Sequence, residues 1–296
     1  MTDLASSIVH YAEEALWQEV SLTPKPGLVD QKTNGAHDDM DFSTFEKSID
    51  SLAPFFQEYY QLGYQHTGDL ISLFDQLRQA GSRAEKAMLT ATNGINTHKG
   101  ANFSFAVLLG ATGKYVQQNK QLTLPFSPQD TQAILQLAGD LTKHLVQQDF
   151  DRLHEKKQLT YGERLYLEKG ITGIRGEAAE GYPSLADHLL PFLRAGKEEE
   201  THLLLLRSLV YLMSEIEDNN LLHRGGFEGL LLVQEECKKI HQANLSEEDL
   251  LNELISYDIL LTKRHLSPGG AADLLALGIY FALLEGLFHS PSGKKV

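Results

Sequence analysis

Apolar residues recur at a helical spacing along almost the whole chain. One stripe runs from Leu4 to Leu16 and another from Phe42 to Tyr59, with apolar side chains mostly three or four positions apart. No alternating run is long enough to predict a strand, and neither an internal repeat nor a low-complexity linker interrupts the pattern. The sequence therefore predicts an all-α fold, in which residues 1–296 form a single domain of roughly ten to twelve helices.

The charge of the chain argues against some classes of partner. The chain holds 26 Lys and Arg against 40 Asp and Glu, a formal net charge of −14. Basic patches bind nucleic acids and membrane surfaces, so the sequence predicts neither as a partner. The longest uncharged apolar run, Leu274–Leu284, is too short to span a bilayer and no secretory signal is evident, so we expect a cytoplasmic location. The one cysteine, Cys237, allows neither an intrachain disulfide nor a cysteine metal cluster.

Glycine gathers in five segments between the expected helices. These segments hold more than half of the 24 glycines in about a third of the chain, and charged residues and histidines stand beside the glycines. Glycine occurs where the backbone turns sharply or lies close to a ligand, although helix caps and tight turns would account for part of this set. We number the segments one to five in chain order: Glu19–Asp41, Met88–Ser104, Thr160–Pro183, Glu217–Gly229 and Thr262–Leu277.

Segment one combines a constrained lysine with a group of acids. Prolines on both sides hold Lys25 in an extended backbone, which suits a lysine that contacts a fixed anion. One imidazole, His37, stands among the four carboxylates of Asp30, Asp38, Asp39 and Asp41. Mg²⁺ prefers carboxylate oxygens, so this loop is a candidate metal site. The alternative is a solvated acidic loop in which Asp41 caps the next helix.

Segments two and three each offer a candidate anion site. Segment two carries Asn96, His98 and Lys99 just before an apolar helix, where backbone N–H groups beside a lysine would bind an anion. In segment three, Arg175 lies between two glycines with room to contact phosphate oxygens, and Glu177 could act as a general base or a metal ligand. The alternatives are a polar helix cap in segment two and a surface Arg–Glu pair in segment three.

Segments four and five bring further polar groups. Segment four places Asp218, His223 and Arg224 in one short stretch that ends in glycines. In segment five, Arg264 precedes Ser267, which could cap the following helix and so place a basic residue near a positive helix end. A solvated helix C-cap in segment four and a plain helix–helix turn in segment five are the alternatives.

The five segments favour one kind of chemistry. The chain has no G-x-S-x-G nucleophile elbow, and no dinucleotide fingerprint follows a strand, since no strand is predicted. Lysines and arginines interleaved with carboxylates indicate a metal-assisted pocket for a polyphosphate, lined by loops on a helical scaffold. Carboxylates outnumber the basic residues in these segments, so we expect the activity to require a divalent metal, Mg²⁺.

Short stretches in all five segments also carry a family pattern. They are TPKPGLVD with NGAHDDMD, NTHKGANFS, GIRGEAAEGYP, NNLLHRGG and RHLSPGGAADLLA, in this order from Glu19 to Leu277. Together they resemble the triphosphoribosyl-dephospho-coenzyme A synthase family. The resemblance implies an enzyme that transfers the triphosphoribosyl group of ATP to the 2′-hydroxyl of 3′-dephospho-coenzyme A and releases adenine. The product would be the prosthetic-group precursor of citrate lyase or malonate decarboxylase, which a separate transferase attaches to an acyl carrier subunit.

The candidate residues fit such a reaction. Breaking the bond between ribose and adenine builds positive charge on the sugar, as in glycoside cleavage. We expect Glu177 to take the proton of the attacking hydroxyl, and His37 or His98 to protonate the leaving adenine. The candidate metal ligands are Asp39, Asp41 and Asp218. The candidate substrate-binding residues are Lys25, Asn96, Lys99, Arg175, His223, Arg224, Arg264 and Ser267.

The sequence is also compatible with two other functions and with two roles for the C-terminal helix. A Mg²⁺-dependent hydrolase of ADP-ribose-like glycosides would use water in place of the second substrate. A non-catalytic helical protein that binds coenzyme A derivatives would not turn ATP over at all. The apolar C-terminal helix would serve either the interface of a homodimer or the core of one chain.

Overall fold

The computed structural model describes residues 3–150, 153, 159 and 161–288. No strand occurs in these ranges, and helices make up most of them, so the prediction of an all-α fold is confirmed. The elements are α1 (Asp3–Ser21), α2 (Phe42–Gln65), α3 (Leu70–Ala91), α4 (Lys99–Gln118), α5 (Pro128–Thr142), α6 (Leu145–Phe150), α7 (Tyr161–Lys169), α8 (Ile174–Ala179), the π-helix η2 (Ser184–Leu189), α9 (Leu190–Ala195), α10 (Thr201–Glu215), α11 (Asn219–Gln242), α12 (Glu247–Lys263) and α13 (Gly269–Leu284).

Local cap chemistry explains where several helices begin. At α2, Oδ1 of Asp41 accepts a hydrogen bond from the backbone N–H of Thr44 over 2.8 Å, and the Thr44 hydroxyl accepts one from the backbone N–H of Asp41. At α5, Ser127 and Asp130 form the same reciprocal pair, and Pro128 is the first helical residue. These bonds satisfy backbone donors that have no partner inside the helix. The cap that the sequence offered at Asp41 is therefore confirmed.

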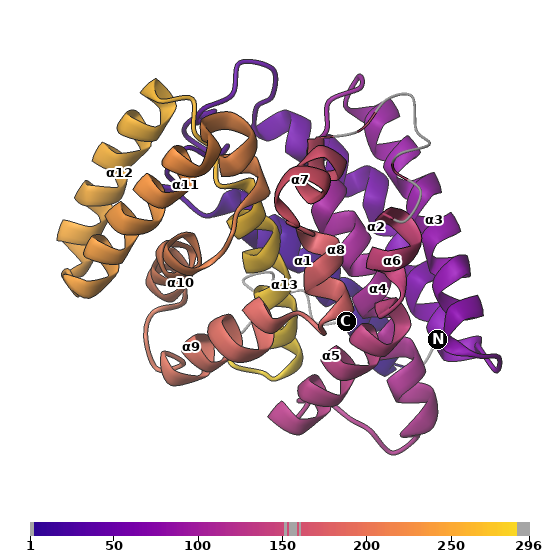
Figure 1. Ribbon diagram of the computed structural model, residues 1–296. Coiled ribbons are helices and arrows are strands. Elements are labelled where there is room, and N and C mark those ends of the chain that lie inside the picture. The colour runs from indigo at the N-terminus through magenta and orange to yellow at the C-terminus, as the bar shows by residue number, and fades with distance from the viewer. Residues whose placement is uncertain (1–2, 151–152, 154–158, 160, 289–296) are drawn as a thin grey trace.

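The apolar C-terminal helix lies in the core. Every residue from Leu274 to Leu284 is buried, on all sides of α13. A helix that is apolar all round is stable in water only when protein surrounds it. Of the two roles expected for this helix, it therefore serves the core of a single chain. Figure 1 shows α13 between two groups of helices, with α2 to α6 on one side and α10 to α12 on the other.

Glycines allow α2 and α4 to approach closely. A Cβ atom on Gly63 of α2 would lie 1.9 Å from the carbonyl oxygen of Gly110 of α4. A Cβ atom on Gly113, one turn further along α4, would lie 2.1 Å from the carbonyl oxygen of Tyr60. Only glycine fits at such backbone contacts. This tight packing positions the N-terminal end of α4, which carries segment two.

Segments three and four are more helical than the sequence predicts. Segment three contains α7 and α8, and segment four forms the start of α11. The side chain of Asp218 accepts bonds from the first N–H groups of α11 and so begins the helix earlier than expected. Gly226, with a φ of 62°, then kinks α11 where a non-glycine residue would be strained. None of the helices in the described ranges combines the length and the apolar character needed to cross a bilayer.

Candidate active site

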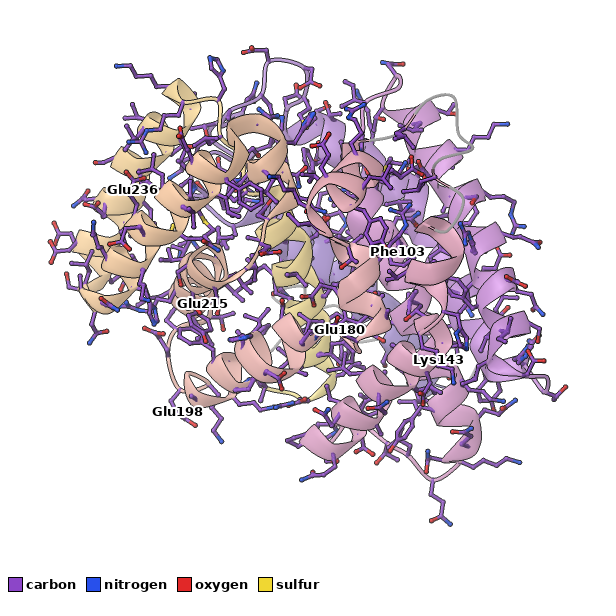
Figure 2. All side chains as sticks on the ribbon, viewed as in Figure 1. Phe103, Lys143, Glu180, Glu198, Glu215 and Glu236 are labelled. Atoms are coloured by element: carbon purple, nitrogen blue, oxygen red, sulfur yellow. The ribbon has the colours of Figure 1, made fainter. Side chains whose placement is uncertain are left out.

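A cavity of about 1040 Å³ lies where the five segments meet. It is at the upper end of the size range for ligand pockets, which leaves space for more than one nucleotide-sized molecule. Phe103 of α4 and Glu180, which follows α8, both line it and lie near the middle of the view in Figure 2. The predicted site residues on its wall are Lys25, His37, Asn96, His98, Lys99, Arg175, Glu177, Asp218, His223, Arg224 and Ser267.

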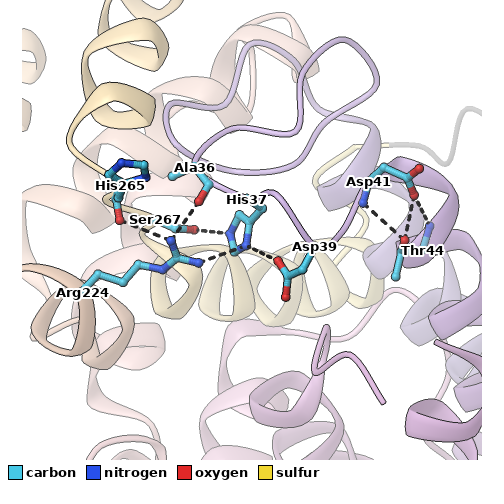
Figure 3. A network of polar contacts seen from close by, with 8 residues as sticks. All are labelled: Ala36, His37, Asp39, Asp41, Thr44, Arg224, His265 and Ser267. Atoms are coloured by element: carbon cyan, nitrogen blue, oxygen red, sulfur yellow. Dashed lines mark hydrogen bonds and ion pairs between the residues drawn. The ribbon is translucent and has the colours of Figure 1, made fainter. Parts of the chain in front are cut away.

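His37 connects segments one, four and five (Figure 3). Its Nδ1 lies 3.0 Å from a terminal nitrogen of Arg224, and its Nε2 lies 2.9 Å from Oγ of Ser267. A guanidinium only donates, so Nδ1 of His37 accepts and Nε2–H donates to Ser267. Burial lowers the pKa of His37, and the Arg224 charge lowers it further, while the Asp39 carboxylate, 3.7 Å away, opposes the shift. His37 is therefore the neutral imidazole near pH 7.

Arg224 holds loops together as well as lining the cavity. Its second terminal nitrogen donates to the carbonyl oxygen of Ala36 over 2.9 Å and to that of His265 over 3.3 Å (Figure 3). These bonds tie segment four to segments one and five. Ser267 is buried at the same junction and lines the cavity. Since Ser267 accepts from His37, its own hydroxyl proton is directed away from the imidazole.

Lys25 is almost completely buried on the cavity wall. Its Nζ lies 2.5 Å from Oε1 of Glu19, and its backbone N–H donates to Asp30. Burial raises the pKa of the Glu19 carboxyl even though the Lys25 charge favours ionisation. No sequence motif marks Glu19 as functional, although this carboxylate is the ion-pair partner of Lys25. Removing one member of a buried pair leaves an uncompensated charge, so the two residues act as a unit.

His98 is buried below Lys99 at the start of α4. Its Nδ1 lies 2.7 Å from Oγ of Ser48, and its buried Nε2 has no hydrogen-bond partner among the described residues. Burial lowers the pKa of His98 to about 3, with a smaller contribution from the charge of Lys25. His98 is therefore uncharged at neutral pH, which does not suit the role of proton donor to adenine.

The other two predicted residues of segment two make contacts at the start of α4. Nζ of Lys99 lies 2.6 Å from Oε1 of Glu85, and the side chain of Asn96 accepts a hydrogen bond from the backbone N–H of Lys99.

Glu177 has the environment of a general base. It lies on α8, lines the cavity, and accepts hydrogen bonds from Oγ of Ser184 over 2.5 Å and from the backbone N–H of Ser184 over 3.3 Å. Burial raises the pKa of Glu177, while the two bonds from Ser184 partly oppose that rise. A carboxylate with a raised pKa is a better proton acceptor near neutral pH. Ser184 begins the π-helix η2, an irregular turn that the sequence does not reveal.

Asp218 bridges two helix ends. It accepts hydrogen bonds from the backbone N–H groups of Asn220 and Leu221 in α11 and of Ala271 in α13. Asp273, which was not among the predicted site residues, likewise accepts a hydrogen bond from the backbone N–H of Ala101 in α4. Burial and the charges of Glu19 and Asp218 raise the pKa of Asp273 well above its usual value. These two carboxylates hold the N-terminal ends of α4, α11 and α13 at the cavity.

Three predicted site residues do not line the cavity. Asp41 is committed to the cap of α2, and the side chain of Asp39 is 65% exposed. Arg264 pairs with Glu236 of α11 over 2.7 Å, and Figure 2 labels Glu236 at the left of the view. Asp218 already accepts three backbone bonds, so the predicted metal trio of Asp39, Asp41 and Asp218 does not converge. Across the part of the chain that the structure describes, no group of three or more His, Cys, Asp or Glu is arranged to hold a metal ion.

Known proteins identify the family of this chain. The family model described as ATP:dephospho-CoA triphosphoribosyl transferase matches residues 5–292. The chain belongs to that family. A relative from Streptococcus mutans serotype c (strain ATCC 700610 / UA159), named "probable 2-(5''-triphosphoribosyl)-3'-dephosphocoenzyme-A synthase", is 49% identical over 288 residues, which cover 95% of this chain and 97% of the relative. A relative of the same name from Streptococcus pyogenes serotype M5 (strain Manfredo) is 51% identical over 289 residues, covering 95% and 98%.

Membership of the ATP:dephospho-CoA triphosphoribosyl transferase family confirms the resemblance that the five segments carry. It also confirms the prediction of an enzyme, since the family and the relatives are named for a transferase activity. No solved structure matches this chain.

Proposed function

We propose that the chain transfers the triphosphoribosyl group of ATP to the 2′-hydroxyl of 3′-dephospho-coenzyme A. The bond between the hydroxyl oxygen and C1′ of the ATP ribose forms, and the bond from C1′ to adenine breaks. The hydroxyl proton passes to a base, and adenine leaves with the electron pair of the broken bond. The observation that carries this proposal is Glu177, a carboxylate with a raised pKa on the wall of a cavity large enough for both substrates.

Glu177 is the proposed base, because Ser184 orients its carboxylate by two hydrogen bonds. The Ser267 hydroxyl, which lies beside His37 at the cavity wall, would donate a hydrogen bond to the leaving adenine, and the proton that adenine needs would come from solvent. The neutral imidazole of His37 would serve to position Ser267. Nε2 of His98, which has no partner within the described part of the chain, suits a hydrogen bond to bound substrate better than proton donation.

Basic and polar groups on the wall would hold the ATP triphosphate. Lys25 and Arg224 would contribute positive charge, and Lys99 would contribute it at the start of α4. Asn96 and His223 would add hydrogen bonds from segments two and four. Charge-assisted bonds to phosphate are stronger than neutral ones, so these groups would orient ATP for attack at its ribose.

Mg²⁺ would enter with ATP as the MgATP complex. Mg²⁺ keeps several waters and binds readily to substrate phosphates, so it does not need a cage of protein carboxylates. This arrangement agrees with the failure of the predicted aspartate trio to converge. The expected requirement for divalent metal stands as part of this proposal, and full activity in excess chelator would contradict it.

The test is mass spectrometry of the products formed from ATP, Mg²⁺ and dephospho-coenzyme A. We expect adenine and a product with the mass of both substrates less adenine. Adenine formed without the acceptor would favour the glycoside hydrolase, and no turnover under any metal condition would favour a binding protein. Glu177→Gln should abolish turnover while ATP binding, measured by calorimetry, survives. Near-normal turnover would exclude Glu177 as the base.

The setting of the reaction is also a proposal. We expect the product to pass to a separate transferase that loads an acyl carrier protein, in the cytoplasm where both substrates occur. A homodimer would have to use a surface other than the buried face of α13. Sedimentation of the purified chain would report its oligomeric state.

A further inference from the structure

A pair of arginines flanks one carboxylate on the cavity wall. A terminal nitrogen of Arg78, on α3, lies 2.6 Å from Oδ1 of Asp149, and Nε of Arg175, on α8, lies 2.8 Å from Oδ2 of the same carboxylate. The Asp149 side chain is only 12% exposed, whereas those of Arg78 and Arg175 are 48% and 35% exposed. All three residues line the cavity. The group therefore presents a net charge of about +1 to the cavity, mainly through two guanidinium groups.

The α3 side of this group faces the cavity over two turns. Arg78, Gly81, Ser82 and Glu85 follow at helical spacing and all line the cavity. Arg83, on the same helix, does not line it and pairs instead with Glu58 of α2. No motif in the sequence marks α3 as functional. Only the packing of α3 against α4 brings Arg78 to the site.

The position of the pair relative to Glu177 indicates which substrate it binds. Arg175 precedes Glu177 by two residues on α8 and both line the cavity, so an anion held by the pair shares the cavity wall formed by α8 with the proposed base. The hydroxyl that Glu177 would deprotonate belongs to the acceptor, and the acceptor's diphosphate is attached to the same ribose. The triphosphate of ATP belongs to the other reactant. Two polyanions in one cavity repel each other, so each needs basic groups of its own.

We infer that Arg78 and Arg175 form the subsite for the diphosphate of the acceptor nucleotide, 3′-dephospho-coenzyme A. The ATP triphosphate then uses the wall formed by Lys25 and Arg224. This inference rests on the proposed function, and it assigns Arg175, a candidate substrate-binding residue, to the acceptor. Guanidinium groups suit a diphosphate because each can form two parallel bonds to neighbouring oxygens. Asp149 keeps the two guanidinium groups together before substrate binds.

The test compares Arg78→Gln with the matched control Arg83→Gln. Steady-state kinetics should show a roughly ten- to hundred-fold higher KM for dephospho-coenzyme A in R78Q, the loss expected for a charge-assisted bond. The KM for ATP should change less than about two-fold, and R83Q should change neither value. Arg175→Gln should repeat the pattern of R78Q. Calorimetry with dephospho-coenzyme A alone and with ATP alone should give the same selectivity, and thermal unfolding checks that each variant is folded.

Other outcomes overturn the inference. A higher KM for ATP in R78Q would assign the pair to the donor, and no change in either KM would make the pair a structural ion pair only. Failure of the proposed function is distinguishable, because wild-type chain would then form no product from the two substrates. Calorimetry would in that case still report which nucleotide depends on Arg78.

Discussion

Arg224 donates a hydrogen bond to Nδ1 of His37 over 3.0 Å, although 187 positions separate the two residues in sequence. The bond sets the tautomer of His37, directs its Nε2–H to Ser267 and places a positive charge beside the ring. We expect Arg224→Gln to raise the pKa of His37, since a charge that opposes protonation is removed. Titration of the ring resonances by NMR measures this directly. Arg264→Gln, an arginine of segment five that pairs with Glu236, is the control. An unchanged titration of His37 in R224Q would refute the coupling.

Ser184 should lower the pKa of Glu177. The two hydrogen bonds from Ser184 favour the ionised carboxylate and so lower the pKa of Glu177 against the effect of burial. Ser184→Ala removes the shorter bond, so the pKa should rise further. A base must be deprotonated to act, so the acidic limb of the kcat/KM profile should move to higher pH. Ser184→Thr, which keeps a hydroxyl, should restore the limb towards its original position. A purely structural role would lower activity at all pH values without moving the limb.

Asp41 should contribute to the stability of the fold and should not act as a metal ligand. It caps α2 and is exposed, so Asp41→Ala should lower the free energy of unfolding by about 1 kcal/mol. Asp69 caps α3 in the same way, through the backbone N–H of Ser72, so Asp69→Ala should cost a similar amount. Urea denaturation measures both losses. The Mg²⁺ dependence of turnover should be the same in both variants. A change in that dependence confined to D41A would restore Asp41 as a metal ligand.

Two helical glycines should respond in opposite directions to alanine. Gly63→Ala places a methyl group against the carbonyl oxygen of Gly110, and a backbone cannot move aside cheaply, so we expect a loss of about 1–3 kcal/mol or more. At Gly81 of α3 the nearest atom to a new Cβ is 3.8 Å away, so Gly81→Ala should stabilise the helix by up to about 1 kcal/mol. The urea midpoints of the two variants test this pair. Equal shifts would contradict the close contact of α2 and α4.

Much of the fold follows from the sequence because its causes are local. Helical spacing of apolar residues predicts helices wherever it is sustained, and the cap expected at Asp41 marks the start of α2 correctly. The prediction is wrong within segments three and four, where glycines indicated loops and the structure contains α7, α8 and the start of α11. There a buried carboxylate, Asp218, supplies bonds that begin α11. Burial of that side chain is a property of the tertiary structure.

The sequence by itself determined the helical class, the family and the five glycine-rich segments that carry the candidate site residues, because each is recognised from residues close together in the chain. Only the tertiary structure decided which of those residues act together. It brings Arg78 from an unmarked helix to Arg175, and it commits Asp41 to a helix cap and Arg264 to Glu236. Ion pairs and pKa values depend on distance and burial, and these arise only when segments far apart in the chain pack against each other.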